Sequence, residues 1–266
     1  MGSERKEDCM REPRIALARM RCEKGDAAAN LDAMAGYLRA ASAAEAEIVA
    51  FPEASITGYV DPDRYPEALA RLDGPEVARF VALTRETPSM TAIAGIVEAN
   101  PHGPPYLTQI AARDGAVLCS YRKRTIPEEE AHLFTPGPPV PAVFTHADLT
   151  CGLAVCADID DAAVFADCAR LGARIVFECA APGLYGEQAT RDWPTGFEWW
   201  RGECFTKLGR YAREQRIWIA VATQAGRTRD EDFPGGGYLF APDGSCAQQT
   251  PDWSEGMLYA TVPRAM

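Results

Sequence analysis

Three residues with reactive side chains each come directly after a short apolar run. Glu53 carries a carboxylate, Lys123 an amine and Cys156 a thiol. The runs that precede them are Ile48–Phe51, Ala116–Arg122 and Leu149–Val155. Such runs are typical of buried strands, and α/β proteins place their sites where strands end at one edge of a sheet. We therefore expect the three side chains to converge on one catalytic site.

Cys156 is the candidate nucleophile of that site. It lies between a predicted strand and a predicted helix, where a side chain is presented at the edge of a sheet and the helix terminus favours a thiolate. A buried structural cysteine is the alternative interpretation. A thiol nucleophile also needs a base. The chain has three histidines, His102, His132 and His146, so a cysteine–histidine hydrolase stays open at this point.

The segments around these residues resemble the nitrilase superfamily of carbon-nitrogen hydrolases. They occur in the order acid, lysine and cysteine, as in that family, and the resemblance extends from about Arg14 to Val262. The segments that carry it are Phe51–Glu53 with Ile56–Tyr59, Tyr121–Arg124 with Phe134–Gly137, and Gly152–Asp158. The resemblance implies a Glu-Lys-Cys triad, with Glu53 as general base, Lys123 as electrostatic stabiliser and Cys156 as nucleophile.

The resemblance also implies a second glutamate shortly before Phe134 and an oxyanion hole. Glu130 fits the second glutamate best, while Glu128 and Glu129 stay open. The backbone N–H of Ala157 is expected to help hold the oxyanion. We further predict that Tyr59 and Trp193 contact the substrate. The aromatic segment Trp193–Phe205 either lines a pocket or packs in the core, and Arg191, Arg201, Arg210 and Arg213 are candidates for binding a substrate carboxylate.

The expected reaction is hydrolysis of a small linear amide through a cysteine thioester, with release of ammonia. N-carbamoyl amino acids or amines and nitriles are the alternative substrates. Small Ala157 stands where true nitrilases commonly carry tryptophan, and this disfavours nitriles. A non-catalytic scaffold with the same fold is the alternative from another class. We expect a single domain, and on that expectation an ammonia donor coupled to a synthetase is disfavoured. The resemblance implies no metal or organic cofactor, and cysteine pairs with zinc spacing are absent.

The elements that must position this site are predicted from periodicity. Short apolar runs alternate with helical patterns, and Asp114-Gly115 and Pro242–Gly244 mark turns between strand pairs. This mixture predicts one α/β domain with mixed sheets over residues 13–266, after a flexible tail at 1–12. The resemblance specifies it as a four-layer α-β-β-α sandwich that assembles into a homodimer or a higher homo-oligomer.

Composition excludes several function classes. The formal charge of −11 argues against binding to nucleic acid or to an anionic membrane surface. Nine scattered cysteines and a polar N-terminus without a signal sequence indicate a reduced, cytoplasmic protein whose partner is its small-molecule substrate. The acids Asp160 and Asp161 are expected to cap a helix or lie in a solvated loop, and Asp230–Asp232 is expected to be solvated loop charge.

Overall fold

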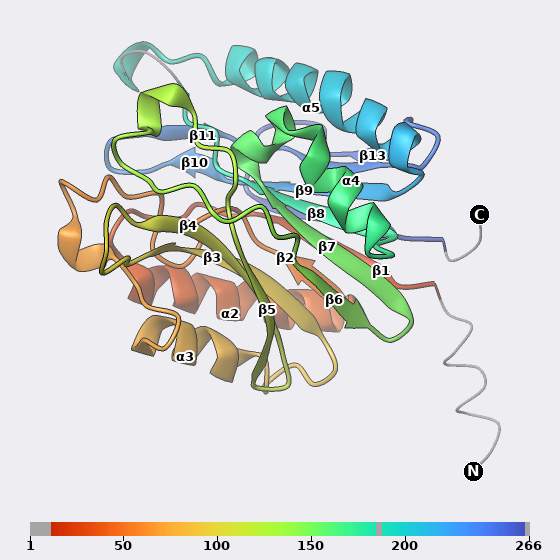
Figure 1. Cartoon of the computed structure of the whole chain (residues 1–266), viewed down its shortest axis with the longest axis horizontal. Helices are drawn as coiled ribbons and strands as arrows, with labels where there is room; N and C mark the ends of the chain where they lie inside the picture. The colour runs from red at the N-terminus through yellow and green to blue at the C-terminus, as the bar shows by residue number, and fades with distance from the viewer. Residues whose placement is uncertain (1–11, 185–187, 264–266) are drawn as a thin grey trace.

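Two six-stranded sheets form the centre of the protein (Figure 1). The computed structural model describes residues 12–184 and 188–263, so the expected tail at 1–12 lies almost wholly outside the described residues. The first sheet has the order β14-β1-β2-β3-β4-β5 and the second the order β13-β12-β9-β8-β7-β6. The first comprises β1 (Arg14–Arg19), β2 (Ile48–Ala50), β3 (Thr91–Glu98), β4 (Tyr106–Arg113), β5 (Ala116–Arg122) and β14 (Gly256–Thr261).

The second sheet has the same mixture of parallel and antiparallel pairs as the first. It comprises β6 (Val143–His146), β7 (Leu149–Val155), β8 (Ile175–Ala180), β9 (Trp218–Thr223), β12 (Gly237–Phe240) and β13 (Cys246–Gln249). The neighbours β7, β8 and β9 are parallel, and the outer pairs are antiparallel. A separate short pair is formed by β10 (Ala225–Arg227) and β11 (Asp232–Pro234).

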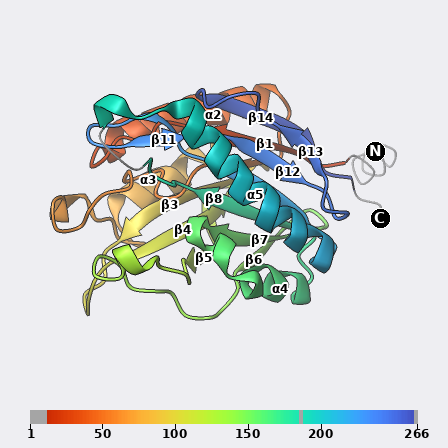
Figure 2. The same ribbon diagram turned by 90° about the horizontal axis from the view of Figure 1, so that it is seen from above.

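Helices cover the outer face of each sheet. The first sheet is covered by α2 (Ala27–Ala43) and α3 (Pro75–Leu83), and the second by α4 (Ala162–Arg170) and α5 (Trp193–Gln215), as Figures 1 and 2 show. Asp26 caps α2, because its Oδ1 accepts a hydrogen bond from the Ala29 N–H at 3.0 Å. The predicted α-β-β-α sandwich is therefore confirmed.

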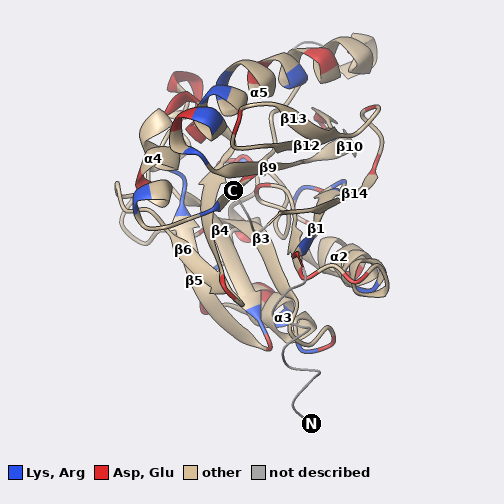
Figure 3. Cartoon of the chain, turned by 90° about the vertical axis from the view of Figure 1, so that its right-hand side faces the viewer, with Lys and Arg blue, Asp and Glu red and all other residues tan. Residues whose placement is uncertain are grey.

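The core occupies both the space between the sheets and the space beneath the helices. Leu17 and Ile93 of the first sheet belong to the same buried cluster as Leu153 and Phe177 of the second. Charged residues gather mainly on the helices, loops and strand ends (Figure 3). None of the described helices combines the length and the apolar character needed to cross a bilayer.

Strand direction brings the reactive residues to one edge. β2 is parallel to β3, β3 is antiparallel to β4, and β4 is antiparallel to β5, so β2 and β5 run the same way. Glu53 and Lys123 therefore leave the first sheet at the same edge. Cys156 follows β7 and Ala181 follows its parallel neighbour β8, so both leave the second sheet at one edge. Three 3-10 helices lie outside the sheets near this edge: η3 (Glu128–Glu130), η4 (Cys156–Asp160) and η5 (Gln188–Thr190); a fourth, η2 (Pro66–Ala68), precedes α3.

Candidate active site

A buried ion pair joins Glu53 to Lys123. Lys123 Nζ lies 3.0 Å from Glu53 Oε1, and each side chain is only 1 % exposed. The other carboxyl oxygen, Glu53 Oε2, accepts a hydrogen bond from the backbone N–H of Ala181 at 3.2 Å. Because both oxygens of Glu53 have donors from different elements, the carboxyl group is fixed in place despite its burial.

Cys156 sits on a strained turn between β7 and η4. Its φ of 47° lies in the left-handed region, which is uncommon for a residue with a Cβ. Ala54, directly after Glu53, has a similar φ of 48°. Such strain persists where surrounding structure over-determines the backbone, and it is frequent at functional sites. The residue after the cysteine, Ala157, lies half-buried at the start of η4.

Asp158 links this turn to the loop that carries Lys123. Its carboxylate accepts hydrogen bonds from the Val155 N–H at 3.0 Å and from the Tyr121 hydroxyl at 2.8 Å. The backbone N–H of Thr125 donates to it as well, at 2.9 Å. Asp158 thus connects the end of β7 to the end of β5 and to the segment that follows it.

Glu130 and Tyr59 meet beside the ion pair. The Tyr59 hydroxyl donates to Glu130 Oε2 at 2.7 Å, and Lys123 Nζ lies 5.9 Å from the centre of the Tyr59 ring. Of the three consecutive glutamates, Glu129 and Glu130 line the cavity described below, and Glu130 makes this bond. The geometry therefore favours Glu130 as the second glutamate.

Burial and neighbouring charges shift the pKa values of all three reactive groups. Burial raises the pKa of Glu53 above its ordinary value of 4.5, while Lys123 opposes the rise and Glu130 adds to it. Burial also raises the pKa of the Cys156 thiol, and the negative charge of Glu53 raises it further against the opposing effect of Lys123. Burial alone would lower the pKa of Lys123, but the negative charge of Glu53, to which Glu130 adds, opposes burial and that pKa is raised. Before substrate binds, Cys156 is therefore a neutral thiol and Lys123 beside it is charged.

A cavity of about 390 Å³ opens onto these groups. Its described lining comprises Tyr59, Lys123, Pro127, Glu129, Glu130, Cys156, Ala157, Ile159, Asp160, Ala181, Pro182, Gly183, Trp199, Trp200 and Glu203. The structure thus brings together Lys123, Cys156, Ala157, Glu130 and Tyr59 from the sequence-predicted set. Glu53 lies directly beneath, on Lys123.

The structure does not bring Trp193 to this cavity. Trp193 begins α5, and its ring stacks 5.2 Å from the guanidinium carbon of Arg227 on β10. The aromatic wall comes instead from Trp199 and Trp200, further along the same helix. The four arginines considered for a substrate carboxylate are likewise absent from the described lining.

The histidines also lie elsewhere. His102 and His132 are exposed in loops, and none of the three histidines lines the cavity. His146 is buried at the end of β6, where its Nδ1 lies 2.9 Å from Thr91 Oγ1. The cysteine–histidine arrangement that the sequence left open is therefore not formed.

Glu178 is a buried carboxyl group that sequence reasoning missed. It lies on β8, is 0 % exposed, and neither of its oxygens has a hydrogen-bond partner of ordinary geometry among the described residues. Burial raises its pKa well above 4.5, and the charges of Asp158 and Glu53 add to the rise. A single acid inside the run Ile175–Ala180 was the available signal, because charge is rare in a buried strand.

The raised pKa of Glu178 predicts a specific pH dependence of stability. The folded state holds the carboxyl proton above pH 4.5, where the unfolded state releases it, so stability declines as pH rises toward the folded pKa. In the Glu178→Gln variant this decline disappears. The free energy of unfolding of the variant minus that of the wild type should therefore increase by about 1.4 kcal/mol for each unit of pH across that window. Urea unfolding at several pH values measures the difference, and a constant difference would contradict the prediction; Glu214→Gln, on an exposed residue, is the control.

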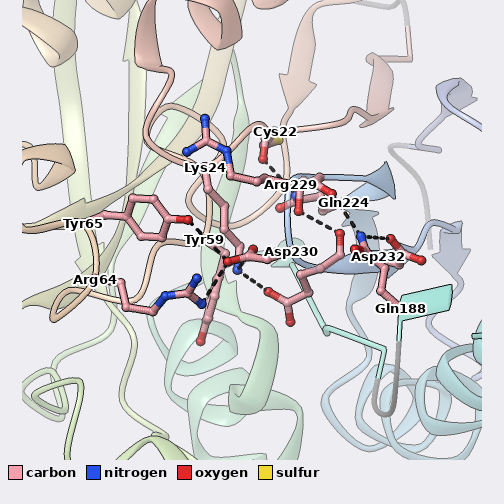
Figure 4. A network of polar contacts seen from close by, with 12 residues as sticks. Cys22, Lys24, Tyr59, Arg64, Tyr65, Gln188, Gln224, Arg229, Asp230 and Asp232 are labelled. Carbon is pink, nitrogen blue, oxygen red and sulfur yellow. Dashed lines mark hydrogen bonds and ion pairs between the residues drawn. The ribbon is translucent and has the colours of Figure 1, made fainter.

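A second polar network lies behind Tyr59. Lys24 Nζ binds Asp230 Oδ1 at 2.9 Å and Glu231 Oε2 at 2.8 Å, and the lysine is only 8 % exposed. Figure 4 shows Arg64 and Tyr65 reaching the same Asp230. Asp232 is fully buried and binds Arg227. The expectation that these acids are solvated loop charge is therefore wrong, because they meet cations that the fold brings from elsewhere.

Removing the lysine from this network should destabilise the protein. Lys24→Met removes the lysine that binds the partly buried Glu231, so the cost should lie between the about 1 kcal/mol of an exposed pair and the about 3 kcal/mol of a buried one. The double variant Lys24→Met/Glu231→Gln should recover much of the loss. Chemical denaturation measures both, with Arg71→Met as control because the Arg71–Asp73 pair is exposed. Equal stability of Lys24→Met and wild type would show that the network is not stabilising.

The fold and the site together define an α-β-β-α protein whose cavity is lined by a cysteine thiol and by the lysine of a buried glutamate–lysine pair. The family model for carbon-nitrogen hydrolases matches residues 14–266, and the chain belongs to this family. This match confirms the resemblance to nitrilase-superfamily hydrolases that the sequence motifs carry.

The chain is also similar to individual known proteins. A glutamine-dependent NAD(+) synthetase from Acinetobacter baylyi is 23 % identical over 94 % of this chain, and a formamidase from Allorhizobium ampelinum is 30 % identical over 50 %. The chain spans only 44 % and 39 % of these two proteins. An amidase from Nesterenkonia sp. AN1 has the same fold, with a TM-score of 0.80 and 24 % identity over 95 % of this chain and 91 % of its own. That structure is a variant with the acetamide moiety of fluoroacetamide added covalently at its active-site cysteine.

Proposed function

We propose that this protein hydrolyses a small linear primary amide through a thioester on Cys156 and releases ammonia. The observation that carries the proposal is the buried Glu53–Lys123 pair, whose lysine lines the same cavity as Cys156. A thiol with a raised pKa needs a nearby base, and Glu53 is a carboxylate held at that position.

Acylation begins when Glu53 takes the proton of the Cys156 thiol. The thiolate sulfur attacks the amide carbon, a C–S bond forms, and the carbonyl electron pair moves to oxygen. Lys123 and the backbone N–H of Ala157 stabilise this oxyanion. When the intermediate collapses, the C–N bond breaks, and the proton held by Glu53 passes to the nitrogen, which leaves as ammonia.

Deacylation uses the same glutamate. Glu53 takes a proton from a water molecule as the water oxygen attacks the thioester carbon. The C–O bond forms and the C–S bond breaks, and the thiolate recovers the proton from Glu53. The negative charges of Glu53 and Glu130 raise the pKa of Lys123, and the Tyr59 hydroxyl holds Glu130 in place by donating to it.

Relatives support an amide rather than a nitrile or an N-carbamoyl compound. The Nesterenkonia protein is described as an amidase and the Allorhizobium protein as a formamidase. Ala157, next to the nucleophile, supports the same choice against nitriles. The glutamine dependence of the synthetase relatives makes glutamine, itself a primary amide, a necessary member of any substrate panel.

Ammonia release from a substrate panel tests the proposal. The panel contains short aliphatic amides, glutamine, N-carbamoyl compounds and nitriles, with Cys156→Ala beside the wild type. We expect the aliphatic amides to react and Cys156→Ala to release no ammonia above background. If only nitriles or only N-carbamoyl compounds react, that compound class would replace small amides as the proposed substrate. Silence across the panel, together with slow labelling of Cys156 by iodoacetamide, would favour the non-catalytic scaffold.

A further inference from the structure

We propose that the preferred amide carries a positive charge, an ammonium group, on the far end of its acyl chain. The inference rests on the proposed function, because it concerns the outer part of the same cavity. The catalytic groups occupy the inner end, so an extended acyl chain places its far end among the residues at the mouth.

The mouth of the cavity is acidic. Glu129, Asp160 and Glu203 line it from three different elements: η3, η4 and α5. The only lysine or arginine in the described lining is Lys123, which is buried against Glu53. Among the described lining residues, an acyl chain that ends in a carboxylate would therefore meet like charge, with no guanidinium and no ammonium except the buried Lys123.

One nearby lysine reduces this charge without cancelling it. Lys207 Nζ lies 2.5 Å from both Asp160 Oδ1 and Glu203 Oε2, so one cation is shared between two carboxylates. Asp160 and Glu203 together keep a net negative charge around this single lysine. The expectation for Asp160 and Asp161 is confirmed, because Asp161 caps α4 and Asp160 is exposed. Asp160 also lines the cavity.

An aromatic face lies among these acids. Trp199 lines the cavity and is 42 % exposed, which is unusual for so large an apolar side chain. Tryptophan is the best aromatic partner for an ammonium group, and acids next to it strengthen that preference. Trp200 is buried, with its Nε1 donating to Thr223 Oγ1 at 2.9 Å, and so holds the helix against the sheet. Apolar and acidic groups in one mouth suit an alkyl ammonium better than a neutral or anionic chain.

Three amides of matched length test the charge preference. δ-Aminovaleramide is the cation, hexanamide its neutral isostere, and adipic acid monoamide the anion. We expect kcat/KM for the cation to exceed that for hexanamide by about tenfold, with the anion lower still. About 0.5 M salt should shrink these ratios, because the mouth is partly exposed. Glu203→Gln should lower the cation-to-neutral ratio by about threefold, whereas Glu214→Gln, on an exposed part of α5, should not change it.

Charged thiol reagents give a second readout that needs no turnover. Aminoethyl and sulfonatoethyl methanethiosulfonate are compared at Cys156 by peptide mass spectrometry, with the half-buried Cys246 of β13 as internal reference. We expect the cationic reagent to be favoured at Cys156 relative to Cys246, and less so in Glu203→Gln.

The charge inference would be overturned by equal reagent ratios at both cysteines, or by hexanamide reacting as fast as the cationic amide. Hydrolysis of hexanamide would in that case still support the proposed amidase. A cationic preference at Cys156 without turnover of any amide would leave the charge of the mouth supported and remove the amidase.

Discussion

Glu53→Gln is expected to lower kcat for amide hydrolysis by about 10²–10⁴-fold. Glutamine cannot take the thiol proton in acylation or the water proton in deacylation, so both chemical steps lose their base. It keeps the size of the side chain and an oxygen that can accept from Lys123 or Ala181. The loss should therefore fall on kcat, with little change in fold, and steady-state ammonia release with circular dichroism measures both.

The wild-type pH profile provides a check on this assignment. Because burial raises the pKa of Glu53, the acid limb of kcat/KM should lie above pH 4.5, and activity should fall as pH decreases through it. A Glu53→Gln variant that retained wild-type kcat would exclude Glu53 as the base. Glu47→Gln, on a partly exposed glutamate outside the cavity, is the matched control and should keep full activity.

Lys123→Met is expected to lower kcat by about 10²–10³-fold, because the oxyanion loses its charged partner. It should also move the acid limb of the profile to higher pH. Lys123 lowers the pKa of Glu53, so its removal lets burial raise that pKa further. Ammonia release measured across pH records both the lower plateau and the displaced limb.

A structural role alone would not displace the limb. If Lys123→Met were merely destabilising, the fraction of folded enzyme would fall while the pH profile kept its position. Active-site titration with a radiolabelled electrophile normalises for that fraction. Lys123→Arg keeps the positive charge and should therefore keep the limb near its wild-type position, even if crowding lowers kcat. An unchanged plateau in Lys123→Met would contradict the assigned role.

Much of the fold followed from local patterns. β5 and β7 begin and end where the apolar runs predicted, and the turn residues Asp114-Gly115 mark the start of β5. The convergence of Glu53, Lys123 and Cys156 also followed, since Lys123 and Cys156 come directly after strands, Glu53 comes shortly after β2, and strand direction takes all of them to one end of the sandwich. The family resemblance supplied the layer order that periodicity alone did not.

The features that local patterns did not predict depend on residues that are distant in sequence. Nothing local in Asp230–Asp232 reveals Lys24, which comes from the opposite end of the chain and converts expected surface charge into a buried network. The rotation of α5 decides that Trp199 rather than Trp193 faces the cavity, and helical spacing does not fix it. The homo-oligomer and the cytoplasmic location expected from the sequence stay predictions.

The most direct test of the account is the covalent intermediate itself. Wild-type protein mixed with excess hexanamide is quenched in acid within milliseconds and digested, and its peptides are mapped by mass spectrometry. We predict a hexanoyl thioester on the peptide that contains Cys156, with an equal amount of ammonia released in the first turnover and no adduct in Cys156→Ala. An acyl group on another residue, or ammonia release that persists in Cys156→Ala, would contradict it.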